Sequence, residues 1–195
     1  MAEGLGRVLI ASGTEKGAVY LKNLLAEFHP ESTTVLQSAV EVRRGLSGGV
    51  HYDFIFVNLP LTDETGVELV KDIAEQGHAF VTAVLRDEVA DQIGPGLVAE
   101  GVFVVRKPVI RAHFLDDVQM MATAWRRLAL LQNENDRLRQ KVEDISLISR
   151  AKCMLIYHKS IDEYEAHRLI EKRAMDERRS KREIAFEILH EFDDE

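Results

Sequence analysis

The sequence predicts a parallel α/β domain, followed by a long helix and a small all-α domain. Three observations support this fold class. β-rich runs alternate with helical spacing up to about residue 120, a heptad pattern follows, and two helix-start signatures divide the remainder. We therefore expect a domain at residues 1–120, a coiled-coil helix at 121–145 and a second domain at 146–195.

Composition excludes several classes of protein. Hydrophobic residues make up 46% and charged residues 30% of the 195-residue chain, and no apolar run approaches the roughly 20 residues that span a bilayer. The start lacks the features of a secretion signal, and the single cysteine, Cys153, which we interpret as a small buried hydrophobe, cannot form an internal disulfide. We expect a cytoplasmic protein without membrane contact.

The first 120 residues contain five β-rich runs. They are RVLIAS from Arg7, TTVLQS from Thr33, DFIFVNL from Asp53, AFVTAVL from Ala79 and VFVVRKP from Val102. The stretches between them show helical stripes, namely Leu21, Leu24, Leu25 and Phe28, then Val67, Leu69, Val70 and Ile73, and then Val89, Ile93 and Val98. Parallel strands need crossover connections, so this alternation predicts a parallel sheet with helices on both faces.

Two of these runs resemble parts of a known family. YDFIFVNLPLTDETGVELV looks like the third strand and following loop of a two-component receiver domain, with Gly66 at the loop glycine, and VFVVRKPV looks like the fifth strand with its Lys-Pro. The resemblance covers about residues 5 to 120 and implies a flavodoxin-like receiver with a five-stranded parallel sheet.

The phosphorylation chemistry of such a receiver is missing. Asn58 stands at the nucleophile position, where a neutral amide cannot form an acyl phosphate, and Ser12 and Gly13 stand where an acidic pair would hold magnesium. Only Lys107 of the phosphorylation set remains. We expect a degenerate acceptor pocket in a pseudo-receiver that serves as a scaffold for protein contacts, with no metal site. The alternative moves phosphorylation to Asp63 in the loop.

A heptad pattern follows the receiver-like region. Apolar residues occupy a and d positions with one asparagine at an a position, in the order Leu128, Leu131, Asn135, Leu138, Val142 and Ile145. Glu134 at g and Arg139 at e have the offset at which opposite charges pair between parallel helices. The pattern predicts a homodimeric coiled coil. The alternative is a helix packed against its own receiver or the C-terminal helices.

Two capping boxes divide the C-terminal residues. Ser160 with Glu163 and Ser180 with Glu183 each have the spacing at which side chain and backbone satisfy each other. They predict a continuation of the long helix to about residue 157, a second helix at about 161–175 and a third at about 181–192.

This module closely resembles the ANTAR domain of transcription antitermination regulators, over about residues 142 to 192. The residues that carry the resemblance are Ala151 with Lys152, Ala166, Ala174 with Met175, Ser180 and Ala185, in the family's order and spacing. Cys153 replaces a usual glycine. The resemblance implies binding to paired stem-loops in nascent leader transcripts, which prevents a terminator from forming.

The charge distribution is consistent with RNA as the partner. The net charge is -8, yet bases crowd into residues 171–185. An RNA reader needs cations and small side chains that allow close approach. The predicted RNA-binding residues are Ala151, Lys152, Arg173, Ala174, Arg178, Arg179, Ser180, Lys181 and Arg182.

Other functions remain alternatives. The chain shows no catalytic constellation, no metal-ligand spacing and no phosphate-binding loop, so we expect a protein that is not an enzyme and needs no cofactor. The receiver-like domain also offers a surface for a regulatory protein partner. The chain is alternatively a signalling adaptor that binds only proteins, or a DNA-binding response regulator.

Overall fold

The computed structural model describes residues 4–77 and 79–193, and the chain divides into two compact units, residues 1–126 and 127–195. The predicted ranges also include residues 1–3, 78 and 194–195, which lie outside the described residues. We refer to the two parts as the N-terminal unit and the C-terminal unit.

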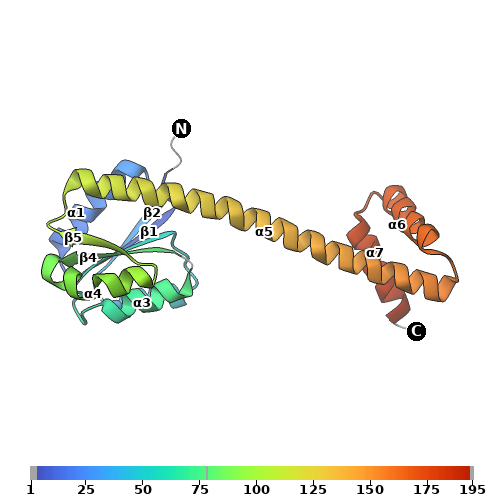
Figure 1. The fold of residues 1–195 in the computed structure, drawn as a ribbon, viewed down its shortest axis with the longest axis horizontal. Coiled ribbons are helices and arrows are strands. Elements are labelled where there is room, and N and C mark those ends of the chain that lie inside the picture. Colours follow the sequence, from blue (N-terminus) through green and yellow to red (C-terminus); the bar gives the residue numbers. More distant parts are fainter. Residues whose placement is uncertain (1–3, 78, 194–195) are drawn as a thin grey trace. The chain divides into compact units, whose positions relative to one another are not determined.

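The N-terminal unit contains a five-stranded parallel sheet in the order β2-β1-β3-β4-β5 (Figure 1). The strands are β1 (Arg7–Ser12), β2 (Ser32–Leu36), β3 (Phe54–Asn58), β4 (Phe80–Arg86) and β5 (Phe103–Lys107). All five strands were predicted, with small shifts at their ends. The register places Ser12 beside Asn58 and Asn58 beside Val84, so the last residues of β1 and β3 lie level with Val84 of β4, which continues to Arg86.

Helices cover both faces of this sheet, as parallel strands require. The helices are α1 (Glu15–Leu25), α2 (Ala39–Ser47), α3 (Val67–Gln76), α4 (Asp87–Ala99) and α5 (Arg111–Lys159), and a short 3-10 helix, η1 (Ala26–Phe28), follows α1. In Figure 1, α1 and the first part of α5 lie on one side of the sheet, and α3 and α4 lie on the other. Two apolar clusters correspond to these two faces.

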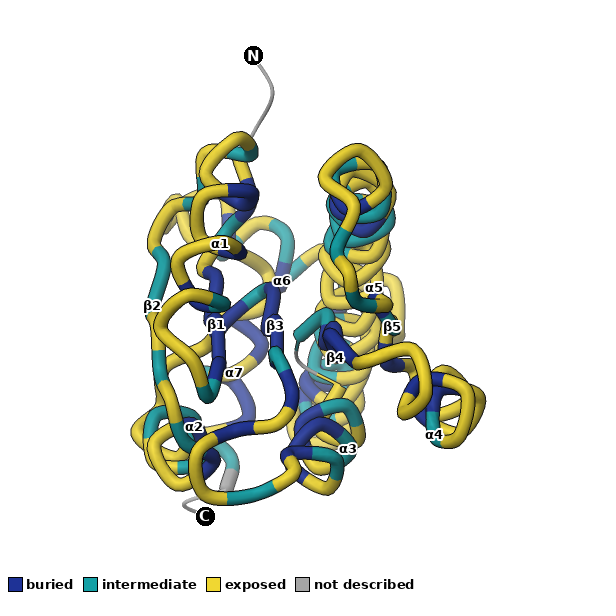
Figure 2. Tube along the Cα trace, turned by 90° about the vertical axis from the view of Figure 1, so that its left-hand side faces the viewer, coloured by how far each residue is buried: buried dark blue, intermediate teal, exposed yellow. Residues whose placement is uncertain are grey.

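The central strands carry the core. Strands β1, β3 and β4 are almost entirely buried, whereas the edge strand β2 is intermediate or exposed (Figure 2). Two of the three predicted helical stripes face this core, although Phe28 and Val67 are only partly buried. The third was wrong in part: Ile93 packs against the core, but Val89 and Val98 are exposed, and α4 buries Ala90, Gly94 and Leu97. Small residues let α4 approach the sheet closely, and an apolar pattern alone does not reveal that.

Gly66 fixes the loop after β3. Its φ of 80° lies in the left-handed region, and a Cβ there would approach Leu59 Cδ2 to 2.2 Å. The predicted loop glycine is therefore required for both its backbone conformation and its close contact.

The C-terminal unit packs α6 (Glu163–Glu177) and α7 (Lys181–Asp193) against the last part of α5. Its core consists of Ala151, Leu155, Ala166, Ile170, Ala174, Ile184, Ala185, Ile188 and Leu189. None of the helices in the described part of the chain combines the length and apolar character needed to cross a membrane.

One of the two predicted capping boxes is present as expected. Ser180 and Glu183 bond each other reciprocally at the start of α7. The Ser160 box was wrong, because α5 continues to Lys159 and Ser160 (φ 51°) belongs to the turn that follows. Asp162 and Glu165 form the box at the start of α6, two residues later.

Candidate functional site

The degenerate acceptor pocket lies at the carboxyl ends of β1, β3 and β5. Asn58 Nδ2 donates to Ser12 Oγ over 2.9 Å, and the buried Ser12 Oγ donates to the Thr14 carbonyl over 2.9 Å. A Cβ on Gly17 would lie 2.3 Å from Asn58 Nδ2, so the first turn of α1 rests on this amide. The residues at the nucleophile and metal positions thus form a neutral hydrogen-bonded chain.

The other strands supply no carboxylate to this pocket. Val84 is the β4 residue in register with Asn58, and Thr82 lies deeper, buried, with its hydroxyl 3.4 Å from Met121 Sδ. Lys107 Nζ at the end of β5 donates to the Leu59 carbonyl over 2.6 Å. Burial lowers the pKa of Lys107, and the positive charge of Arg86 adds to this shift.

Asp63, the alternative acceptor, caps a helix. Its carboxylate accepts hydrogen bonds from the backbone amides of Ala39 over 2.8 Å and Val40 over 3.1 Å, at the start of α2. These bonds lower the pKa of Asp63 below its usual value. Both carboxylate oxygens are therefore engaged in holding the β3–α3 loop to α2.

We expect Asp63→Ala to lower the thermal midpoint of the protein, since two helix amides lose their acceptor. Because the folded pKa is depressed, this contribution is complete above about pH 4, the usual range of an unfolded Asp, and is lost as pH falls through the folded value. Thermal melts of Asp63→Ala beside Asp116→Ala, an exposed residue of α5, test this. Equal midpoints for both variants, or a difference that grows below pH 4, would contradict the assignment.

The basic run of the C-terminal unit is paired with acids. Lys152 Nζ lies 2.8 Å from Glu163 Oε1, Lys181 contacts Glu171, and Arg182 contacts Asp144. The hydrogen bond from Lys181 lowers the pKa of Glu171, and the hydrogen bond from Arg182 lowers the pKa of Asp144, so these pairings favour the ionised form of both carboxylates.

Arg173 and Arg179 share two carboxylates. Arg173 Nε lies 2.8 Å from Glu177 Oε1 and Arg179 Nη1 lies 3.0 Å from Glu177 Oε2, while both guanidinium groups also contact Glu187. Arg173 additionally reaches Glu191 over 3.1 Å. This network joins α6 to α7. A single exposed ion pair contributes little to stability and only a network of several contributes measurably, so another anion can compete for an individual cation of this network.

Arg178 differs from its neighbours. It caps α6 in the left-handed conformation, with φ 53° and ψ 41°, and its side chain is exposed. Within residues 4–77 and 79–193, no acid pairs with Arg178. Together with Ser180 at the start of α7, it forms the tip of the turn between α6 and α7.

Three residues lie elsewhere than the sequence interpretation placed them. Ala151 is fully buried and Ala174 nearly so, and both face the helix packing of the C-terminal unit. Their small size allows close approach of helices, and neither side chain is open to a ligand in this structure. Cys153 is exposed, so its interpretation as a buried hydrophobe was wrong. It falls on the outer face of α5, between the inward-facing Ala151 and Leu155.

The predicted coiled-coil seam is open in the single chain. Its five apolar residues, Leu128, Leu131, Leu138, Val142 and Ile145, are 45 to 66% exposed, and Asn135 is exposed among them. The alternative interpretation required this stretch of α5 to pack against other parts of the same chain. Among the described residues of the C-terminal unit, α6 and α7 do not cover it.

The comparison with protein families decides what the C-terminal unit is. The family model described as "ANTAR domain" matches residues 136–189. Residues 136–189 are an ANTAR domain. The match includes α6, most of α7 and the whole basic run, and it confirms the resemblance found in the sequence.

Solved structures identify the fold that precedes the ANTAR domain. The response regulatory domain of protein mrkE from Klebsiella pneumoniae is 19% identical, with a TM-score of 0.54, and the similarity covers 62% of this chain and 98% of that one. The signal receiver domain of a putative Luxo repressor protein from Vibrio parahaemolyticus is 16% identical, with a TM-score of 0.57 and coverages of 65% and 97%. The N-terminal unit has the receiver fold. No curated protein matches this chain.

Sequence reasoning missed the acids that accompany the ANTAR bases. Glu177 stands four residues after Arg173, which is a recognised helical ion-pair spacing and was a detectable signal. Glu187 and Asp144 come from other helices, so only the folded structure reveals their pairing. Lys16, which lines the acceptor pocket, was also missed, although it follows the first strand closely.

Proposed function

We propose that the protein is an RNA-binding transcription antiterminator that acts as a homodimer in the cytoplasm and is not an enzyme. The single observation that carries the proposal is the ANTAR match at residues 136–189, which includes the basic run. The resemblance implies binding to paired stem-loops in leader transcripts, and the exposed Arg178 at the tip of the α6–α7 turn supports contact with phosphate.

We further propose that the receiver-fold unit relays regulation without phosphorylation of an aspartate. The amide of Asn58, its bond to Ser12 and the engagement of Asp63 with α2 support this. Acetyl phosphate with magnesium should therefore leave the mass of the protein unchanged. A stable phosphoadduct, located by peptide mapping, would overturn this part of the proposal.

Binding to a defined RNA tests the main proposal. The purified protein is titrated with an RNA that carries two adjacent small-loop hairpins, beside a loop-scrambled RNA and duplex DNA, at several salt concentrations. We expect tight binding to the paired hairpins alone. Equal, weak binding to all three would contradict RNA recognition and favour a signalling adaptor, and preferential binding to the duplex would favour a DNA-binding regulator.

The shared acid Glu187 gives a sharper test. Glu187→Gln should raise affinity for the paired hairpins by a few-fold, because it removes one of the two shared carboxylates that compete with phosphate for Arg173 and Arg179. The control is Asp176→Asn, which removes the same charge from α6 at an exposed position. An equal rise in both variants, in filter-binding titrations, would mean that only net charge matters.

A further inference from the structure

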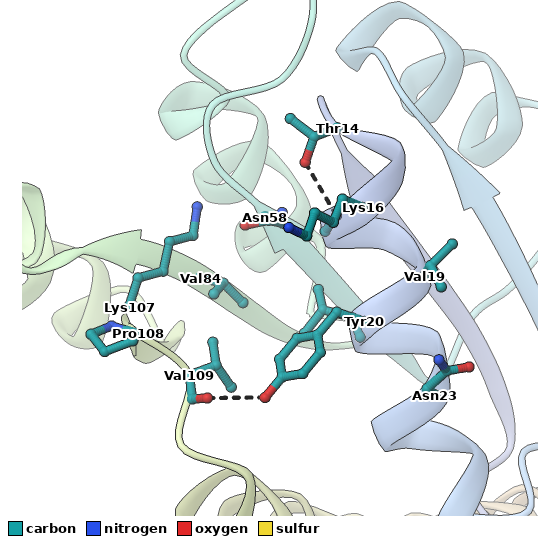
Figure 3. Close-up of a pocket in the computed structure, with 12 residues that line it drawn as sticks. Thr14, Lys16, Val19, Tyr20, Asn23, Asn58, Val84, Lys107, Pro108 and Val109 are labelled. Carbon is teal, nitrogen blue, oxygen red and sulfur yellow. Dashed lines mark hydrogen bonds between the residues drawn. The ribbon is translucent and has the colours of Figure 1, made fainter.

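The degenerate acceptor pocket opens into a cavity of about 610 Å³ between the start of α1 and the chain that follows β5 (Figure 3). This volume lies in the range of sites that hold small organic molecules. The lining includes Lys16, Tyr20, Asn58, Val84, Lys107 and Val109, all from the N-terminal unit.

The cavity is positively charged. Figure 3 shows the side chains of Lys16 and Lys107 extending toward Asn58 from opposite sides. None of the described residues that line the cavity is Asp or Glu. With the neutral Ser12, Gly13 and Asn58 at positions where a receiver carries acids, the two ammonium groups have no carboxylate in the cavity to balance them.

Lys107 in particular lacks a balancing charge. It is partly buried, burial lowers its pKa, and its one described hydrogen bond goes to the neutral carbonyl of Leu59. Among the described residues, the one charge that shifts the pKa of Lys107, that of Arg86, is also positive. Burying a charge is unfavourable unless an opposite charge accompanies it, so an anion in the cavity would offset this unfavourable arrangement.

The remaining wall is apolar and held in place. Tyr20 donates its hydroxyl to the Val109 carbonyl over 3.1 Å, which fixes the ring at the edge of the cavity beside Val84 and Pro108. A free phosphate ion would leave this wall uncovered. The geometry fits a ligand with an anionic head near the lysines and an apolar body along the wall.

We propose that this cavity binds a small organic anion, a carboxylate or phosphate on an apolar or aromatic body, with its head between Lys16 and Lys107 and beside Asn58. The binding is noncovalent, so no bond to Asn58 forms. A role for this ligand as the signal that controls RNA binding rests on the proposed function, whereas the binding site itself does not.

Calorimetry on the full-length protein tests the site without RNA. The probes are benzoate and phenyl phosphate, beside benzamide and inorganic phosphate. We expect at least one aryl anion to bind about tenfold or more tightly than benzamide, because a charge-assisted contact is lost in the neutral probe. Inorganic phosphate should bind more weakly than phenyl phosphate, and the two aryl anions distinguish a carboxylate site from a phosphate site. Undetectable binding of both aryl anions at millimolar concentration would overturn the proposal.

Variants locate the binding. Lys107→Met and Lys16→Met should each weaken binding about tenfold, and Asn58→Asp should weaken it similarly by placing a negative charge beside the head group. Lys22→Met, which removes an exposed lysine of α1 outside the cavity, is the matched control. Because Lys16 is exposed, its variant keeps the test valid if Lys107→Met does not fold. An equal loss in the Lys22 variant, or unchanged affinity in Asn58→Asp, would refute the assignment.

Failure of this proposal is distinct from failure of the proposed function. Hairpin binding without aryl-anion binding refutes only the ligand site, and aryl-anion binding by a protein that ignores the hairpins refutes only the RNA-binding role.

Discussion

Leu138→Asp should convert the proposed dimer to a monomer and reduce affinity for the two-hairpin RNA by about 100-fold or more, because two linked binding modules gain affinity through effective concentration. Leu138 occupies a d position of the heptad pattern and is 50% exposed in the single chain. A charge at this position is solvated in the monomer, whereas in a coiled coil it would be buried at the centre of the interface.

The matched control lies on the same helix. Leu130 is 69% exposed but falls outside the a and d positions, so Leu130→Asp should leave the dimer and the RNA affinity unchanged. Sedimentation equilibrium measures the mass of each variant, and circular dichroism verifies that helix content is retained. A Leu138→Asp protein that remains dimeric, or a Leu130→Asp protein that dissociates equally, would contradict a dimer interface at the a and d positions.

Neutralising the bases in the α6–α7 turn and at the start of α7 should abolish most of the affinity for RNA. The variant replaces four bases by glutamine, at Arg178, Arg179, Lys181 and Arg182. The logarithm of the binding constant falls linearly with the logarithm of the salt concentration, and each phosphate contact adds about 0.7–0.9 to the magnitude of that slope. The magnitude should therefore fall by as much as about 3 if all four side chains contact RNA. Glu187 loses its contact with Arg179 and Glu171 loses its contact with Lys181, so both carboxylates would in addition repel the phosphates more strongly.

Glutamine is shorter than the replaced side chains but is polar, unbranched and similar in helix preference, so the ANTAR core should remain folded. The control carries the same charge change in the N-terminal unit, at the exposed Arg7, Lys22, Arg44 and Arg86. Electrophoretic mobility shifts with the paired hairpins, repeated across salt concentrations, give both slopes. Similar losses in the two variants would indicate a general effect of net charge.

Most of the receiver fold could be predicted because its signals are local. Continuous apolar runs such as that of β3 identify buried strands, and the loop glycine Gly66 reports a backbone conformation that other residues rarely adopt. On α4 only Ile93 of the predicted stripe packs against the core, because the buried residues of this helix are Ala90, Gly94 and Leu97, and two of these are small.

The candidate sites were less accessible to sequence reasoning. Asn58 was recognised as a neutral residue, but its bond to Ser12 and the contact with Gly17 depend on how three segments meet. Likewise, the basic run was visible in the sequence, whereas the acids that hold it come from α5, α6 and α7. Ala151 and Ala174 show the same limit, because a small residue suits both a ligand surface and a helix contact.

The shared carboxylate of Glu187 places folding and binding in competition. Arg173 and Arg179 cross-link α6 to α7 through this residue in the free protein. A guanidinium group that turns to a phosphate gives up that cross-link, so the same side chains cannot serve both purposes at once. Variants selected for greater thermal resistance should therefore strengthen the ion pairs of these arginines and lose affinity for RNA. Variants selected for tight RNA binding should instead weaken these ion pairs and hold α6 less firmly to α7.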